Sequence, residues 1–445
     1  MHPAELPRNR IHMNALNSEN KSDEQMTDSA AAHIVFAGGG TAGHLFPGLA
    51  VAQELRERSP ETRVTFAGTG KEFERRHVGR AGFDYLALPC QPLPKSATQL
   101  WRFLADHFAG ARAAASFLSN EHVSVVVGLG GYASVPMGRA AIRRRVPLVL
   151  LEQNAYPGRA TRLLATKADA VCLALAKAKL HLRARGHVYV TGNPVRAEFT
   201  RCVAGSGVES VAGTRAERVA GTGAEPPARR SPGALEPSLL ADDSRRSEEG
   251  RLKPGLQRRL VVLGGSGGSS ELNRIVPKAL HKVRSLLDGW QIVHQSGIAD
   301  RDETESLYGK LGLSASVVPF VVNIAQVLRW SDLAVCRAGG TTLAELAAVG
   351  VSAVLVPWSE AAGDHQRRNA EVYTRIGAAA TLDVAAAIGR LDDALAELLV
   401  MPLTQRELRE AMATAMRRMA RPEATADVVT RIEELLAVNL QTAAA

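Results

Sequence analysis

At residues 33–44 the chain reads HIVFAGGGTAGH, and this stretch decides the fold class. A short apolar strand at 33–37 runs into a glycine turn, and a helical pattern follows at 45–58. Glycine permits the tight turn and lets backbone N–H groups approach a phosphate, while the helix N-terminus adds partial positive charge. The stretch therefore predicts an anion-binding strand–loop–helix unit of an α/β domain.

The same alternation of short strands and helices continues along the chain. Further strands of the first half are predicted at 64–67, 123–127, 146–151, 170–173 and 188–191. Those of the second half are predicted at 259–263, 291–294, 316–320, 333–336, 353–356 and 379–382. Helical stretches such as 99–120 separate them, which is typical of parallel βαβ units. We predict an α/β protein of two Rossmann-like domains, each a doubly wound parallel sheet, facing each other across a cleft.

Composition changes suggest where the domains begin and end. The polar, aperiodic residues 1–32 are expected to be a disordered N-terminal extension, and translation from Met26 is a hypothesis that N-terminal sequencing tests. The predicted division is an N-terminal domain at 33–196, a low-complexity insertion at 203–257, a C-terminal domain at 258–425, and a helix at 426–445 that returns to the N-terminal domain.

The bulk properties favour a cytoplasmic protein with anionic partners. The N-terminus lacks the apolar segment of a signal peptide, and no stretch reaches the roughly 18 to 20 apolar residues of a membrane span. Four scattered cysteines suit a reducing compartment. The net charge of +9 favours phosphates or acidic lipid surfaces, although a generally basic proteome explains it nearly as well.

Polar motifs follow several of the predicted strands. Two further glycine turns lie at 128–134 and 264–269, and CRAGGTTLAE at 336–345 opens a helix whose N-terminus suits a diphosphate. Glu345, one turn into that helix, could accept hydrogen bonds from a ribose. His44 follows the first glycine loop and is equally compatible with a general base and with a residue that caps the turn.

In this order, the motifs resemble those of the bacterial enzymes that add N-acetylglucosamine to undecaprenyl-diphosphate-linked muramoyl-pentapeptide (lipid I), forming lipid II for peptidoglycan. The resemblance spans about residues 33–430 outside the insertion. It rests on GGGTAGHLFPGLAVA, GLGGYASVP, LEQN, GNPVR, GGSGGS, HQSG, CRAGGTTLAE and DHQRRNA. It implies a GT-B fold, transfer from UDP-N-acetylglucosamine with inversion at the anomeric carbon, and neither a cofactor nor a metal.

The resemblance also implies roles for individual residues. It makes His44 the catalytic base. The implied UDP-N-acetylglucosamine contacts are Thr41, Ala42, Gly43, Asn154, Arg196, Ser266, Val321, Gly340, Thr341, Thr342, Leu343, Ala344, Glu345 and Gln366. Secondary candidates are His365, Asn369, Gly130, Gly131 and Tyr132. Ala42 stands where the family often has glycine, which keeps the loop small but narrows the φ range of its backbone.

A lipid acceptor implies a peripheral site on the cytoplasmic face of the inner membrane. Residues 95–108 mix aromatic and basic side chains, and three arginines follow at 143–145, as suits an anionic bilayer surface. A helix that packs its apolar stripe on the sheet explains part of that stretch equally well. Cell-wall and division proteins are further candidate partners, and nucleic acid is not expected.

Three other functions compete with this interpretation. Another UDP-sugar enzyme of the same fold, either a glycolipid-forming transferase or an epimerase, is the first alternative. A nicotinamide-dependent oxidoreductase is disfavoured because the second strand ends AGTG at 67–70, without the acid that binds a ribose. A non-catalytic binding subunit is disfavoured because both halves keep their polar loops.

Overall fold

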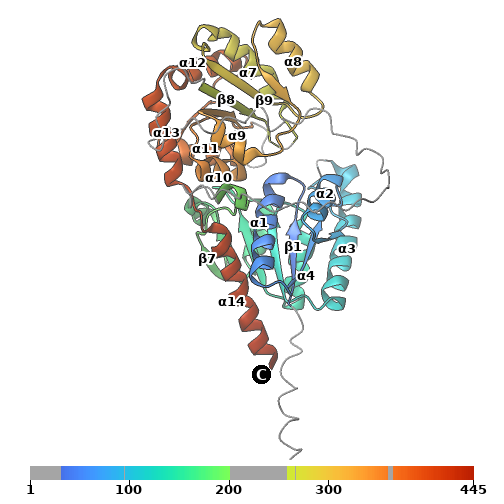
Figure 1. Ribbon diagram of the computed structural model, residues 1–445. Coiled ribbons are helices and arrows are strands. Elements are labelled where there is room, and N and C mark those ends of the chain that lie inside the picture. Colours follow the sequence, from blue (N-terminus) through green and yellow to red (C-terminus); the bar gives the residue numbers. More distant parts are fainter. Residues whose placement is uncertain (1–31, 95, 201–257, 266, 359–363, 445) are drawn as a thin grey trace, which may run out of the picture.

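A computed structural model describes residues 32–94, 96–200, 258–265, 267–358 and 364–444 (Figure 1). Within these ranges the chain forms two α/β domains, one above the other in Figure 1, each built on a parallel sheet. The predicted fold class is confirmed. The predicted extension and insertion lie outside the described residues.

The N-terminal sheet has seven parallel strands in the order β3-β2-β1-β4-β5-β6-β7. Their bounds are β1 (His33–Gly38), β2 (Arg63–Gly68), β3 (Asp84–Ala87), β4 (Val125–Gly130), β5 (Leu148–Glu152), β6 (Ala170–Leu173) and β7 (His187–Tyr189). Six strands were predicted for this half, so β3 is a correction. It is a four-residue edge strand with no fully buried residue, and it therefore lacks the apolar run that marks the central strands.

Helices cover both faces of this sheet. They are α1 (Ala42–Arg58), α2 (Glu72–Arg80), α3 (Ala97–Asn120), α4 (Ser134–Arg144), α5 (Arg159–Ala165), the 3₁₀ helix η1 (Ala176–His181) and α6 (Ala197–Thr200). Because α1 begins three residues earlier than predicted, His44 lies in its first turn.

The C-terminal sheet has six parallel strands in the order β10-β9-β8-β11-β12-β13. Their bounds are β8 (Arg258–Leu263), β9 (Trp290–Gln295), β10 (Ser316–Val318), β11 (Leu333–Cys336), β12 (Ala353–Leu355) and β13 (Ala379–Thr381). The surrounding helices are α7 (Ser270–Lys282), η4 (Arg284–Leu286), α8 (Arg301–Lys310), α9 (Ile324–Trp330), α10 (Gly340–Val349), α11 (His365–Arg375), α12 (Leu391–Thr404) and α13 (Arg406–Arg418). In the described ranges, no helix combines the length and apolar composition that crossing a membrane requires.

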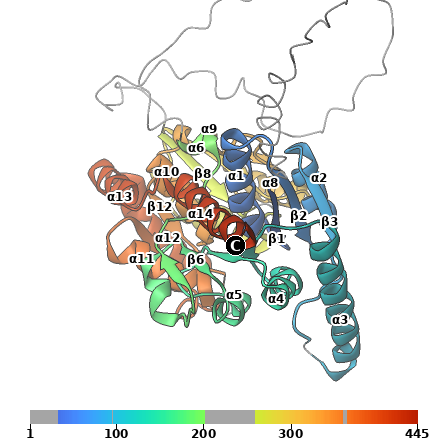
Figure 2. The ribbon, with the colours of Figure 1, turned by 90° about the horizontal axis from the view of Figure 1, so that it is seen from below.

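The last helix, α14 (Ala424–Ala444), lies against the N-terminal domain (Figure 2). Val428, Val429 and Ile432 are fully buried in the core cluster that contains the strand residues Ile34 and Phe36. The polypeptide therefore passes from one domain to the other at two points, near residue 200 and near residue 420.

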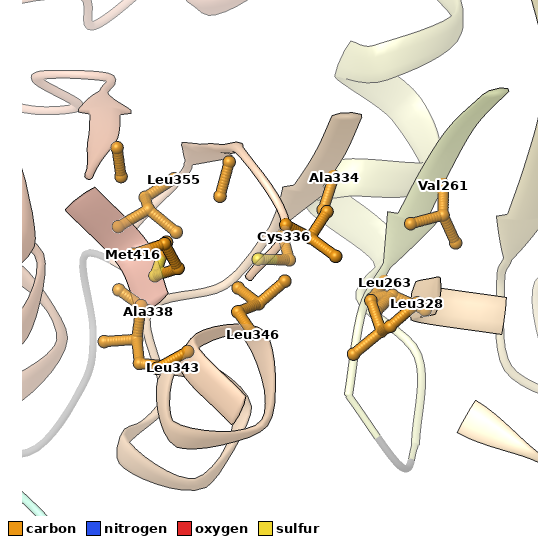
Figure 3. Packing of buried hydrophobic residues seen from close by; sticks show 14 of the residues in the cluster. Val261, Leu263, Leu328, Ala334, Cys336, Ala338, Leu343, Leu346, Leu355 and Met416 are labelled. Atoms are coloured by element: carbon orange, nitrogen blue, oxygen red, sulfur yellow. The ribbon is translucent and has the colours of Figure 1, made fainter. Parts of the chain in front are cut away.

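One core cluster of the C-terminal domain holds α10 against its sheet (Figure 3). Leu343 and Leu346 of α10 pack with Cys336 of β11, Leu355 of β12 and Met416 of α13. This packing fixes the direction of the helix whose N-terminus faces the other domain.

Truncating Leu346 to alanine should lower the free energy of unfolding by about 2–5 kcal/mol, because the side chain is fully buried and leaves a cavity. Denaturant titration measures the change. Leu180→Ala, at a leucine that is 81% exposed, is the control and should cost less than about 0.5 kcal/mol. A similar loss in both variants would contradict the packing described for α10.

Candidate functional site

The two domains meet where the N-terminus of α10 approaches the first glycine loop. Thr341 Oγ1 donates a hydrogen bond of 2.8 Å to the carbonyl of Gly43. Asn193 Nδ2, from the segment after β7, donates to Thr341 Oγ1 at 3.4 Å. A Cβ atom at Gly340 would lie only 2.3 Å from the carbonyl oxygen of Gln153, so the close approach requires glycine. The topology therefore brings together loops that are about 300 residues apart in sequence.

His44 lies at the centre of this contact. Its Nδ1 is 3.0 Å from Thr41 Oγ1, and its ring packs on the turn formed by Gly130 and Gly131. A Cβ at Gly130 would lie 3.1 Å from His44 Cδ2, so a side chain there would displace the imidazole. Burial, aided by the nearby His365, lowers the pKa of His44 to about 4. The imidazole is therefore neutral at pH 7, and the tautomer that donates from Nδ1 to Thr41 leaves Nε2 able to accept a proton.

The first glycine loop rests on a buried carboxylate that sequence reasoning missed. Glu74, at the start of α2, accepts hydrogen bonds from the backbone N–H of Gly40, from Thr69 and from the hydroxyl of Tyr85. The Gly40 N–H is thus already engaged. An anion bound by this loop would therefore contact the backbone N–H groups of Ala42 and Gly43 at the start of α1. The available signal was the pair of acidic residues, Glu72 and Glu74, in the first turn of the helix after β2.

Glu345 and Arg196 join the domains on the other side of α10. Glu345 is 8% exposed, and its Oε1 accepts a bond of 3.2 Å from Arg196 Nη2. The guanidinium of Arg196 also lies over the rings of Phe46 and Phe199, at 4.9 and 5.2 Å. Burial raises the pKa of Glu345 to about 7, although the charge of Arg196 opposes the shift. The predicted ribose acid and the predicted phosphate ligand are therefore in direct contact.

Asparagine side chains bridge the domains next to β5. Asn369 of α11 is fully buried and accepts a bond of 2.7 Å from the backbone N–H of Ala155. Its amide nitrogen donates to Asn154 Oδ1 at 3.0 Å and to the carbonyl of Ala338 at 3.1 Å. Asn369, predicted as a secondary sugar contact, thus has its whole amide engaged in the interdomain contact. Gln366, on the same helix, accepts from the backbone N–H of Trp358 at 2.9 Å.

The other predicted site residues within the described ranges lie in three kinds of environment: beside the first glycine loop, along an interdomain cavity, or in the buried core. Tyr132 lies beside Gly40, and Ala344 lines an interdomain cavity of about 200 Å³ with Gln153, Asn193 and Gly340. The side chain of Leu343 is fully buried in the core cluster beneath α10. Val321 is buried after β10. Ser266 lies outside the described residues.

If Glu345 accepts hydrogen bonds from a ribose, as the resemblance implies, affinity for the nucleotide ligand should rise about three- to tenfold between pH 6 and pH 8. Ionisation of Glu345, whose pKa is about 7, converts it into a carboxylate, which accepts stronger hydrogen bonds than its protonated form. Calorimetric titration measures the trend, with Glu345→Gln as the variant that should remove it. The facing charged groups are Arg196 and Glu198. A pH-independent wild type would contradict the role of Glu345.

Two facing parallel-sheet domains with glycine loops at the carboxyl ends of their strands have the arrangement of the GT-B fold. Residues 34–173 match the model of the glycosyltransferase family 28 N-terminal domain, and residues 259–425 match the model of its C-terminal domain. The chain belongs to the family of UDP-N-acetylglucosamine--N-acetylmuramyl-(pentapeptide) pyrophosphoryl-undecaprenol N-acetylglucosamine transferases.

Similar proteins cover nearly the whole chain. The transferase of that name from Carboxydothermus hydrogenoformans is 34% identical over 396 residues, covering 88% of this chain and 95% of its own length. That of Azotobacter vinelandii is 34% identical over 407 residues, covering 89% and 97%. The crystal structure of MurG from Acinetobacter baumannii is 27% identical, with a TM-score of 0.63 over 91% of this chain and 99% of its own. The predicted family and GT-B fold are confirmed.

A solved UDP-N-acetylglucosamine 2-epimerase also has this fold. It is 13% identical, with a TM-score of 0.57 over 90% of this chain and 95% of its own. At that identity the likeness shows the fold alone, so it does not favour the epimerase alternative.

Proposed function

We propose that this protein transfers N-acetylglucosamine from UDP-N-acetylglucosamine to the 4-hydroxyl of undecaprenyl-diphosphate-linked N-acetylmuramoyl-pentapeptide. The product is lipid II, and the anomeric carbon is inverted. The names of the relatives support this reaction. The observation that carries it is the position of the His44 imidazole, beside Thr41 of the first glycine loop and where the N-terminus of α10 meets that loop. The protein thereby acts in peptidoglycan synthesis, and so in cell-wall growth, cell shape and division.

The geometry suits a single displacement. His44 Nε2 takes the proton of the acceptor hydroxyl as the oxygen attacks C1 of the donor sugar. The bond from C1 to the UDP oxygen breaks on the opposite side, which inverts the anomeric centre. Negative charge develops on the leaving diphosphate, where the N-terminus of α10 at residues 340–342 and the guanidinium of Arg196 stabilise it.

The proposed donor and acceptor contacts are those that the family resemblance implies. Glu345 accepts bonds from the ribose, and Val321 lies beside the uracil. Gln366 and His365 orient the N-acetylglucosamine. Thr41, Ala42, Gly43 and Asn154 contact the donor sugar or the acceptor diphosphate, with Gly130, Gly131 and Tyr132 beside them.

Product analysis tests the reaction and separates it from epimerisation. Incubation with donor and lipid-linked acceptor should give a β-linked disaccharide, identified by the coupling constant of its anomeric proton in NMR. Incubation with donor alone should leave UDP-N-acetylglucosamine unchanged. Conversion of the donor to its 2-epimer without acceptor would overturn the proposal.

The first turns of α3 form the membrane-facing surface in this proposal. Trp101 is 78% exposed and Phe108 is 70% exposed, whereas Ala114 and Leu118, farther along the helix, are buried. The second half of α3 therefore packs on the sheet, and the first half presents aromatic side chains to solvent. Arg139 of α4 lies 3.2 Å from His107 and supplies positive charge nearby. This surface suits peripheral binding at the cytoplasmic face of the inner membrane, where cell-wall and division proteins are candidate partners.

Replacing Trp101 and Phe108 together with serine should weaken binding to anionic lipid vesicles about tenfold or more, because two large apolar anchors are lost. Vesicle co-sedimentation measures the change. Leu180→Ser removes an exposed leucine outside α3 and should leave vesicle binding unchanged. Equal vesicle binding by the double variant and the wild type would remove α3 from the proposed membrane surface.

A further inference from the structure

Two arginines from different domains share one aromatic ring close to the interdomain asparagines. Arg368 of α11 places its guanidinium carbon 4.0 Å from the centre of the Tyr156 ring, and Arg162 of α5 places its own at 5.1 Å. Arg162 Nη1 also donates to the Tyr156 hydroxyl at 3.2 Å. Stacking on a ring holds a guanidinium in place while its N–H edge stays able to bind an anion.

Neither Arg162 nor Arg368 forms a salt bridge with an acidic residue in the described part of the chain. The Nε atoms of Arg162 and Arg368 are both buried without a hydrogen-bond partner. The acid nearest along α11, Glu371, pairs with Lys177 at 3.2 Å and with Arg367. A buried donor without a partner is costly, and two like charges over one ring add to that cost. Both side chains are half-buried, and an anionic ligand on their accessible guanidinium edges would offset the repulsion between them.

The position of this arginine pair relative to the reacting centre indicates which anion it would take. Tyr156 lies two residues beyond Asn154, and Arg368 lies one helical turn beyond His365, which is close enough to His44 to contribute to lowering its pKa. In a muramoyl sugar the peptide is attached through the 3-oxygen, next to the 4-hydroxyl that is attacked. The peptide therefore begins beside His44, and its carboxylates lie within a few residues of that point.

We propose that Arg162 and Arg368, stacked on Tyr156, bind a carboxylate of the acceptor's peptide and so select acceptors that carry it. The inference rests on the proposed function, since it assigns the peptide end of that acceptor. Arginine presents paired N–H donors that match the two oxygens of a carboxylate.

Steady-state kinetics of the double variant Arg162→Gln/Arg368→Gln test this subsite with three acceptors: the lipid-linked muramoyl-pentapeptide, the same lipid without peptide, and one with its peptide carboxylates amidated. The KM for the pentapeptide acceptor should rise about tenfold or more. The KM values for the other two acceptors and for UDP-N-acetylglucosamine should stay within about twofold of the wild type. Arg368→Lys should restore part of the affinity, and Arg375→Gln, at the exposed end of α11, is the matched control.

Other outcomes overturn the subsite. An equal rise in KM for the acceptor without peptide would assign the pair to the diphosphate or to domain packing. Wild-type KM values in the double variant would mean that the arginine pair has no role in acceptor binding. Calorimetry can measure the binding of a soluble muramoyl-pentapeptide without any sugar transfer. This measurement therefore tests the subsite independently of the proposed reaction. Binding lost in the double variant supports the subsite even if the wild type transfers no sugar, and unchanged binding contradicts it.

Discussion

Replacing His44 with alanine should lower turnover by a factor of about 100 to 10,000, the range expected for loss of a general base. The affinity for UDP-N-acetylglucosamine should stay within about twofold, because the imidazole faces the acceptor side of the cleft in the proposed mechanism. The pKa of His44, about 4, keeps the imidazole neutral at physiological pH, so that one ring nitrogen has a free lone pair. Single-turnover rates and donor titration measure the two quantities separately.

His44→Gln distinguishes a base from a residue that only positions the loop. Glutamine can keep a hydrogen bond to Thr41 but cannot accept the proton at neutral pH. Loss of activity comparable to that of the alanine variant supports proton transfer. Recovery of most of the wild-type turnover would give His44 a positioning role instead.

Replacing Gly340 with alanine should lower kcat/KM by about 5- to 150-fold, equivalent to the roughly 1–3 kcal/mol that overpacking costs. The added Cβ would lie 2.3 Å from the carbonyl oxygen and 2.9 Å from the carbonyl carbon of Gln153. Both are backbone atoms, so the domains must separate to relieve the contact. Separation would also disturb the bond from Thr341 to Gly43. Steady-state kinetics with both substrates measure the loss.

The neighbouring glycine provides a matched control. A Cβ at Gly339 would meet only Thr342 Oγ1, at an ordinary 3.8 Å, and the backbone φ of −69° suits alanine. Gly339→Ala should therefore retain near-wild-type kcat/KM. Equal losses in the two variants would mean that the effect arises from the loop itself and not from the approach of the domains.

The sequence predicts the fold well because buried parallel strands are short apolar runs. β1, β5 and β11 have every residue buried, and all three were predicted. β3 was missed because it lies at the sheet edge and its residues Asp84–Ala87 are half exposed or exposed. A run of apolar residues in the sequence indicates a buried strand. An edge strand has too few buried residues to produce such a run.

The site was predictable only as a set of motifs. The glycine loops were found because each of them follows an apolar strand, and Glu345 was found because it lies one turn into the helix that such a loop opens. Glu74 was missed, and Gln153 and Asn193 were found only as members of the LEQN and GNPVR motifs, since their roles depend on contacts with distant loops that no local pattern encodes. The contact between Arg196 and Glu345 likewise joins residues 149 positions apart and appears only once the domains are placed.

The measurement that tests the central claim most directly is UDP release from UDP-N-acetylglucosamine by the purified protein, with and without lipid-linked muramoyl-pentapeptide. The proposed function predicts release that depends on the acceptor and matches the disaccharide formed in a one-to-one ratio. Protein that is folded and binds UDP but releases none with this acceptor would contradict the proposed acceptor. Protein that does not bind UDP at all would contradict the transferase function itself.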